Sequence, residues 1–173
     1  WGKAANEKAV IESGMSYAIL RPTVLVGTED ILINNIAFLM RRFPLFFIPG
    51  DGSYGIQPVF VEDLADLAVE GVYSKENYVI DAVGPDSYTF KEFVKLIGEH
   101  VGAKRMLISV PPRLALFAAQ FLSLFMKDVI LTPEEVDGLM GNLLVSKEPA
   151  RAKTAFKDWL NNNQETVGVK YAS

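Results

Sequence analysis

The chain has 173 residues, half of them hydrophobic and 22% charged, with a formal net charge of −4. This length and composition are those of about one ordered globular domain. The acidic balance, without any run of basic residues, argues against a nucleic-acid or anionic-membrane surface, because both attract clustered Lys and Arg. The absence of cysteine excludes disulfides and thiolate metal sites.

Histidine is nearly absent as well. With His100 as the single histidine, we expect neither a zinc cluster nor a Ser-His-Asp triad, and no metal site is predicted. His100 follows a helical pattern, so we interpret it as an ordinary polar residue near a helix end.

The first part of the chain predicts a helix, a strand and a second helix. Residues 3–13 are rich in helix-forming residues and are followed by a glycine that supplies a stop. The short apolar run 16–20 favours a buried parallel strand. Apolar residues throughout 31–42 predict a second helix that ends before Pro44. We interpret FFIPGDGSYG, at 46–55, as a turn, because Pro-Gly-Asp-Gly offers fixed-φ and positive-φ positions.

Strands and helices alternate in the central part of the chain. A short strand precedes a helix that begins near Glu62, and another strand covers 77–82. A helix capped at Ser87 or Thr89 follows, and then a strand at 106–110. This alternation predicts an α/β architecture.

The last third of the chain is predicted to be helical. The segment 111–131 contains an apolar core, 114–126, that is shorter than the ~20 residues needed to span a bilayer. We interpret it as a buried or interface helix. The alternative is docking on a partner or membrane surface, because Phe117, Phe121 and Phe125 form one aromatic stripe. Further helices are expected at 132–140 and 148–168.

No glycine-rich dinucleotide fingerprint follows a strand anywhere in the sequence. The nearest candidate, PGDGSYG at 49–55, lies in a loop before a Gln-Pro strand and not between a strand and a helix. We therefore expect negligible dinucleotide affinity from these 173 residues alone.

Three blocks stand in a fixed order: GKAANEKAVIESGMSYAILRPTVLVG, FIPGDGSYGIQPVFVEDLADLA and NYVIDAVGPDSYTFKEFVKLIGEHVG. Together they resemble the C-terminal half of extended or atypical short-chain dehydrogenases/reductases. This branch includes the NAD-dependent epimerases/dehydratases, NmrA-like proteins and proteins like the 39-kDa subunit of complex I. The resemblance covers about residues 1–102.

The resemblance implies the C-terminal part of a Rossmann-like, doubly wound parallel sheet with a small, largely helical substrate-side subdomain. Residues 1–83 would form the Rossmann-like portion with substrate-loop insertions, and residues 84–173 the mainly helical region. The dinucleotide-binding N-terminal half is expected to lie outside this chain, which begins inside a helical pattern.

The resemblance also implies a role for Lys3. In the family, a Tyr-x-x-x-Lys motif lies on the helix before the strand that ends in Arg-Pro, and Lys3 matches the lysine. The tyrosine would fall two positions before Trp1. A tyrosine, with a pKa of about 10, needs a nearby cation to act as an acid or base at neutral pH. Lys3 is therefore the expected catalytic and cofactor-binding residue, and the alternative is a solvated helix lysine.

The turn after the first strand is the second expected site. The resemblance implies that the nicotinamide end of the cofactor is approached by Arg21, Pro22, Thr23 and Val24. It also implies that Gly27 lines the substrate-binding site. A proline there closes the strand at its carboxyl end, where open α/β sheets bind ligands. The alternative for Arg21 is that it anchors a loop through a carboxylate.

QPVFVEDLADL matches the family's strand-to-helix unit. Asp63 is expected to cap that helix and orient the loop, and Gln57 is expected to contact substrate. Sugar-nucleotide epimerases often carry an arginine where Ile56 and Gln57 stand. A neutral glutamine cannot make the charge-assisted fork that a diphosphate favours, so nucleotide sugars are disfavoured as substrates.

Three functions remain open. The first is the substrate-side part of an NAD(P)-dependent oxidoreductase or epimerase, with NAD or NADP as cofactor and a small-molecule substrate. The second is a non-catalytic NAD(P)H-binding sensor or assembly protein that binds a partner, or a second copy, through residues 114–126. The third is a structural domain without a ligand. We expect a cytoplasmic location, no transmembrane segment and no nucleic-acid partner.

Overall fold

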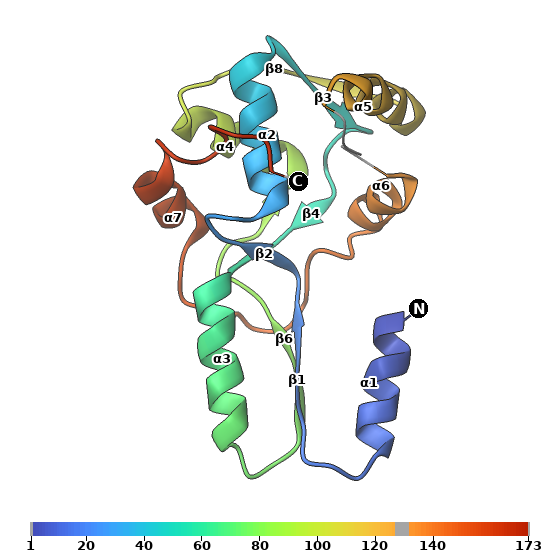
Figure 1. The fold of residues 1–173 in the computed structure, drawn as a ribbon, viewed down its shortest axis with the longest axis vertical. Coiled ribbons are helices and arrows are strands. Elements are labelled where there is room, and N and C mark those ends of the chain that lie inside the picture. Colours follow the sequence, from blue (N-terminus) through green and yellow to red (C-terminus); the bar gives the residue numbers. More distant parts are fainter. Residues whose placement is uncertain (1, 127–131, 173) are drawn as a thin grey trace.

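The protein is described from a computed structural model that covers residues 2–126 and 132–172, with the backbone alone for 124–126. The helices are α1 (Gly2–Glu12), α2 (Ile31–Arg42), α3 (Val61–Tyr73), α4 (Phe90–His100), α5 (Pro112–Met126), α6 (Pro133–Met140) and α7 (Phe156–Asn163). The strands are β1 (Ala18–Pro22), β2 (Val24–Val26), β3 (Leu45–Pro49), β4 (Gly55–Ile56), β5 (Pro58–Phe60), β6 (Tyr78–Ala82), β7 (Tyr88–Thr89) and β8 (Met106–Val110). Figure 1 shows these elements along one long axis, with α1, α3, β1 and β6 toward one end and α2, α5 and β8 toward the other.

The described strands pair two by two. The pairs β1–β6, β2–β5 and β3–β8 are parallel, and β4–β7 is antiparallel. Parallel neighbours need long crossover connections, and helices supply them here. The predicted α/β class with parallel strands is therefore confirmed.

The β1–β6 pair lies between two helices. α3 packs against β1, and α1 lies on the other side (Figure 1). α1 buries none of its residues, so packing contributes little to holding it in place. It runs opposite to β1, and its first turn therefore lies toward the carboxyl end of that strand.

Local signals place α2 where the sequence predicts it. Asp30 begins the helix by accepting a hydrogen bond from the Ile33 amide, and the helix ends two residues before Pro44. One face is buried at helical spacing, with Ile33, Ala37 and Met40 almost fully enclosed. This face supplies one wall of the main core.

The opposite wall of the core is formed by α4 and α7. A capping box begins α4, in which Thr89 and Glu92 bond each other's backbone amides, so Thr89 and not Ser87 is the cap. The ring centroids of Phe93 and Phe156 lie 4.7 Å apart in a stack that joins α4 to α7.

Two predicted boundaries are wrong. Residues 45–49 form β3 and are not part of a turn, because pairing with β8 extends them; only the following residues turn, with positive φ at Gly50 and Gly52. The last helix begins at Phe156 and not near 148, since the preceding residues bond to other elements as a loop. β2, β4 and β7 were missed because two or three residues carry no periodic pattern.

Several contacts cross the predicted division at residue 83. β3 pairs with β8, and α2 packs against α4. The division into two parts stays a prediction. None of the helices within 2–126 and 132–172 is both long and apolar enough to cross a bilayer.

Candidate functional site

The predicted site lies at the carboxyl ends of β1 and β6, which we call the rim. In the β1–β6 register, Arg21 stands opposite Asp81, and Pro22 stands opposite Ala82. Each strand thus brings one charge, of opposite sign, to the edge where parallel sheets bind ligands.

Arg21 is held by two carboxylates. Its Nε donates to Glu7 Oε2 at 3.0 Å and its second guanidinium nitrogen bonds Glu7 Oε1, while its third nitrogen lies 3.9 Å from Asp81 Oδ1. The Arg21 hydrogen bonds lower the pKa of Glu7, and Glu7 in turn raises the pKa of Arg21. Arg21 therefore anchors a neighbouring segment through a carboxylate, and that segment is α1 and not a loop. Its side chain is still 53% exposed.

Lys3 lies on α1, one turn before Glu7. Residues four apart share a helix face, so the face that Glu7 turns toward the rim also carries Lys3. Lys3 is exposed, and within the part of the chain that the structure describes it makes no hydrogen bond or ion pair. The Glu7–Arg21 ion pair thus joins the helix face that carries Lys3 to the end of β1.

Asp81 connects the rim to the C-terminal part of the chain. Its Oδ2 accepts a hydrogen bond of 2.6 Å from Ser146 Oγ, which also accepts from the Glu148 amide at 3.1 Å. One carboxylate therefore contacts both Arg21 of β1 and the loop after α6.

Gln57 and Thr23 are used inside the protein. Gln57 is 8% exposed; its Nε2 donates to the Gly84 carbonyl at 2.9 Å, and its Oε1 accepts from the Ser146 amide at 3.2 Å. Thr23 Oγ1 donates to the Gln57 carbonyl, and Val24 beside it is buried. The nitrogen and the oxygen of the Gln57 side-chain amide are therefore both hydrogen-bonded within the protein. The contact of Gln57 with substrate stays a prediction.

Asp63 does not cap its own helix. Phe60 occupies the cap position, and the Asp63 carboxylate accepts hydrogen bonds from the amides of Lys153 and Thr154 at 3.0 and 2.7 Å. The predicted capping role is wrong, because the carboxylate meets donors from a distant loop. It does orient a loop, as expected, but one that is 90 residues away.

Gly27 opens the loop from β2 to α2. A Cβ at this position would lie 3.1 Å from Val61 Cγ1, so the glycine allows close packing. Next to this loop is a shallow cavity of about 440 Å³, lined by Thr28, Glu29, Asn34 and C-terminal residues 165, 166 and 169–172. The residues that line it include ones with hydroxyl, carboxylate and ammonium side chains.

Three residues that contribute to contacts at the rim were not predicted from the sequence: Asp81 of β6, Glu7, which binds Arg21, and Ser146, which binds Asp81. One signal was present, because Arg21 and Asp81 are opposite charges in two otherwise apolar strands. Glu7 gave no signal, since α1 has no amphipathic face. The described residues contain no group of three or more His, Asp or Glu side chains that could hold a metal ion.

No protein-family model matches the sequence. The chain is similar to NADH dehydrogenase [ubiquinone] 1 alpha subcomplex subunit 9, mitochondrial, of Arabidopsis thaliana, with 30% identity over 98 residues. This match covers 55% of the chain and 24% of that relative. Among solved structures, UDP-glucose 4-epimerase of Thermotoga maritima, determined with UDP-glucose, matches 94% of the chain and 49% of its own (TM-score 0.62, 21% identity).

A second solved structure agrees with the first. The dTDP-4-dehydrorhamnose reductase of Bacillus anthracis, in complex with NADP, matches 92% of the chain and 51% of its own (TM-score 0.58, 16% identity). The fold is that of NAD(P)-dependent epimerases and reductases. The resemblance to extended short-chain dehydrogenases/reductases is thereby confirmed. The chain spans about half the length of these two structures.

The comparisons also bear on location. The curated relative carries the word mitochondrial in its name, so the predicted cytoplasmic location is not confirmed.

Proposed function

We propose that this chain forms the substrate-side part of an NAD(P)-dependent oxidoreductase or epimerase. The observation that carries the proposal is the Glu7–Arg21 ion pair, which joins α1, the helix that carries Lys3, to the carboxyl end of β1. The fold supports the proposal, because the two solved structures that share it are by name an epimerase and a reductase, and the reductase was determined in complex with NADP.

The residues expected to bind the cofactor have the following roles in this proposal. The Lys3 ammonium would hydrogen-bond a ribose hydroxyl and lower the pKa of a neighbouring tyrosine. Pro22, Thr23 and Val24 would form the wall beside the nicotinamide, and Arg21 would present its exposed guanidinium edge. NAD(P), when bound, supplies the hydride acceptor or donor. The Lys3 ammonium, a donor only, suits the ribose hydroxyls, and the pyrophosphate would be held elsewhere because these residues lack the glycine fingerprint.

The cavity beside Gly27 is the proposed substrate pocket. It contains two carboxylates, Glu29 and Glu165, against one ammonium, Lys170. Carboxylates repel a diphosphate, and the buried Gln57 offers it no positive charge. We infer a small polar substrate without a diphosphate.

The second candidate is a non-catalytic NAD(P)H-binding assembly protein. The relative from Arabidopsis thaliana is a complex subunit by name, and the Arg21 guanidinium is already bound by Glu7. In this case the rim would hold the nucleotide without transferring hydride.

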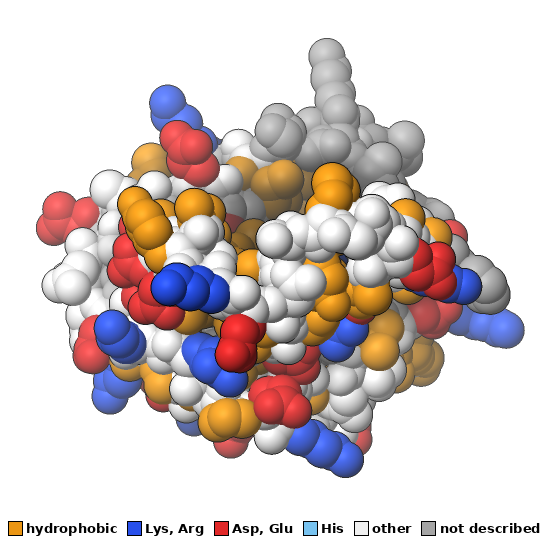
Figure 2. All heavy atoms as spheres, turned by 90° about the horizontal axis from the view of Figure 1, so that it is seen from below, with side chains coloured by type: hydrophobic (Ala, Val, Ile, Leu, Met, Phe, Trp, Pro, Cys, Tyr) orange, Lys and Arg blue, Asp and Glu red, His pale blue; other side chains and the backbone are white. Residues whose placement is uncertain are grey.

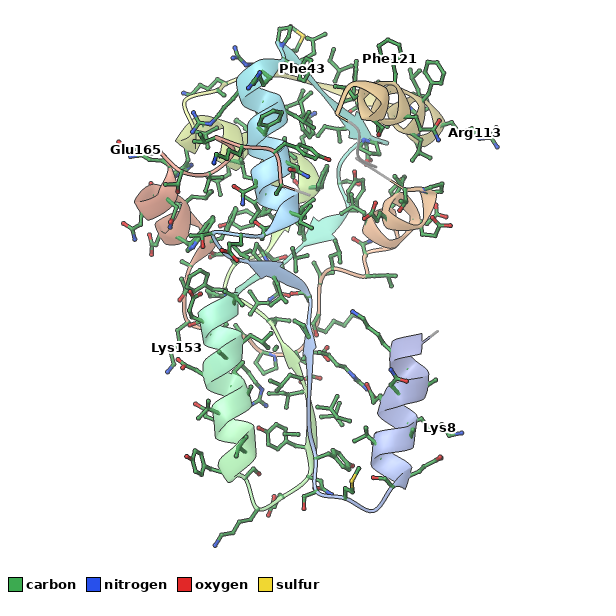
Figure 3. The ribbon with its side chains drawn as sticks, viewed as in Figure 1. Lys8, Phe43, Arg113, Phe121, Lys153 and Glu165 are labelled. Atoms are coloured by element: carbon green, nitrogen blue, oxygen red, sulfur yellow. The ribbon has the colours of Figure 1, made fainter. Side chains whose placement is uncertain are left out.

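The test is a fluorescence titration of NADH and NADPH with the natural polypeptide that carries this chain. Lys3→Ala should weaken binding about tenfold, the effect of losing one hydrogen bond from a charged donor. Lys8→Ala is the matched control, because Lys8 lies on the same helix, pairs with Glu12 and points away from β1 (Figure 3). Equal binding by Lys3→Ala and the natural protein would contradict the role of Lys3.

Two further results separate the alternatives. Hydride transfer that Lys3→Ala abolishes supports the enzyme, whereas Lys3-dependent binding without any turnover supports the assembly protein. Residues 1–173 alone should bind dinucleotide far more weakly than the natural polypeptide. Micromolar binding of dinucleotide by residues 1–173 alone would contradict the proposal that the pyrophosphate is held by another part of the polypeptide.

A further inference from the structure

Charge is segregated along this chain. Segments 31–50 and 100–126 contain five of the 17 Lys and Arg residues and none of the 21 Asp and Glu residues. The five are Arg41, Arg42, Lys104, Arg105 and Arg113. The net charge of −4 therefore does not describe these segments.

The two segments lie together in the fold. β3 and β8 pair along their whole length, and α5 packs against β3. Arg105, before β8, donates from Nε to the Met40 carbonyl at the end of α2, at 2.8 Å. Figure 3 places Phe43, which follows α2, and Phe121 of α5 at the same end of the long axis. We call this surface the basic apolar end.

The basic side chains here are not neutralised by carboxylates. Arg41 donates to the carbonyls of Gln164 and Val167, and the Arg42 guanidinium lies 5.0 Å from the centroid of the Phe38 ring. Across residues 2–126 and 132–172, none of the five forms an ion pair. Their charge is therefore available to an external anion.

Large apolar side chains are exposed between these charges. On α5, Ala115 and Ala119 are buried, whereas Leu114, Phe117 and Phe121 are 52%, 67% and 57% exposed. The prediction of a buried helix thus holds for the alanine face alone; Phe125 lies outside the described side chains. The neighbouring strands add Leu45, Phe47 and Met106, and the end of α2 adds Phe43, all between 38% and 66% exposed. Several large exposed apolar side chains on elements that pack against each other, as α5 and β3 do, are typical of an interaction site.

We propose that the basic apolar end binds the surface of a membrane that contains anionic lipids. The apolar side chains would enter the boundary between headgroups and acyl chains, and the basic ones would contact lipid phosphates. The combination of exposed apolar side chains with the basic side chains of these two segments favours this occupant, because both contribute to binding at an anionic lipid surface. At the opposite end, Figure 2 shows Lys and Arg interspersed with Asp and Glu. This proposal departs from the expectation drawn from the net charge, because the net charge averages over two different ends of the chain.

The test is sedimentation of the chain with vesicles of phosphatidylcholine alone or mixed with phosphatidylglycerol. We expect binding to the mixed vesicles that is at least about tenfold tighter than to phosphatidylcholine and that weakens as salt is added. Combining Lys104→Glu with Arg113→Glu should weaken binding by about tenfold or more, since each basic residue contributes a factor of about five. Phe117→Gln should also weaken it.

Control variants lie away from this end. Val72→Gln removes an apolar side chain of α3 that is 80% exposed, and Lys153→Glu reverses a charge beside α3 (Figure 3). Both should bind as the natural chain does, with unchanged circular dichroism in all variants. Absence of binding to the mixed vesicles, or equal losses in the controls, would overturn the proposal. Self-association that Phe117→Gln abolishes, without vesicle binding, would also overturn it and assign the surface to a second copy.

Discussion

Glu7 and Arg21 join a helix with no buried residue to the carboxyl end of a parallel strand. Two guanidinium nitrogens meet the two oxygens of one carboxylate, which is the geometry in which arginine binds carboxylates best. Because α1 gains little from packing, this contact decides where Lys3 lies.

Glu7→Gln should therefore loosen α1 without unfolding the rest of the chain. A glutamine keeps one acceptor but loses the charge and the two-point contact, so amide hydrogen exchange in residues 2–12 should accelerate while the main transition temperature stays within about 2 °C. Lys8→Gln, which removes an exposed pair with Glu12, is the control and should leave exchange unchanged. Equal exchange in Glu7→Gln and the natural chain would show that something else holds α1.

The same pair predicts a response to acid. Arg21 lowers the pKa of Glu7 below its unfolded value, so the contact is formed above that value and is lost as the pH falls through the folded pKa. Exchange in α1 should rise selectively at acidic pH below about 4, and this rise should be absent in Glu7→Gln.

Asp30 predicts the opposite dependence. Burial raises its pKa to about 6, and among the described side chains its Oδ2 is buried without a hydrogen-bond partner. Because the folded pKa exceeds the unfolded value of about 3.9, stability from this group is greatest below pH 4 and decreases as the pH rises to 6. Asp30→Asn keeps an oxygen for the Ile33 amide but carries no charge. Relative to the natural chain, the variant should gain about 2–3 kcal/mol of unfolding free energy between pH 4 and pH 7.

Urea unfolding at both pH values measures this difference. Asp51→Asn is the control. Hydrogen bonds from Ser53 lower the pKa of Asp51, so the stability from its charge is lost only below the unfolded value of about 3.9, and the stability of this variant relative to the natural chain should change little between pH 4 and pH 7. Parallel stability profiles for Asp30→Asn and the natural chain would refute a raised pKa at Asp30.

The parts of the fold that the sequence predicts are those with local causes. Thr89 and Thr132 each precede a glutamate by three residues, and both form capping boxes. Lys3 and Arg21 were predicted as site residues from the family resemblance, in which the motif lysine lies on the helix before the strand that ends in Arg-Pro. β4 and β7, and the bond from Ser146 to Asp81, depend instead on partners more than 30 residues away. No local pattern encodes such partners.

Asn34 carries a similar long-range role. It is 8% exposed; its Nδ2 donates to the carbonyls of Thr28 and Asp30, and its Oδ1 accepts from the Gly168 amide at 3.0 Å. Asn34→Ala leaves these groups without partners and should cost about 2–3 kcal/mol in urea unfolding.

Asn35→Ala provides the comparison for Asn34→Ala. Asn35 is half-buried and bonds the amide and carbonyl of Ala172, so its loss should cost only about 1 kcal/mol. Equal costs for the two variants would mean that the Asn34 bonds do not set the position of the C-terminal segment.

Gly84 is required by close packing. Its φ is not positive, but a Cβ would lie 1.8 Å from the Pro58 carbonyl oxygen, which belongs to β5 and cannot move without breaking the pair with β2. Gly84→Ala should therefore cost about 3 kcal/mol or more, or prevent folding. Gly138→Ala, within α6, would meet only Leu143 Cδ1 at 4.0 Å, an ordinary contact, and should instead gain about 0.5–1 kcal/mol. Gly102→Ala isolates the effect of a positive φ, since its φ is 68° with no atom within 4 Å, and should cost about 1 kcal/mol. Thermal unfolding of the three variants compares the cost of the backbone clash with that of the positive φ. A Gly84→Ala protein as stable as Gly102→Ala would show that the contact between position 84 and the Pro58 carbonyl of β5 can relax.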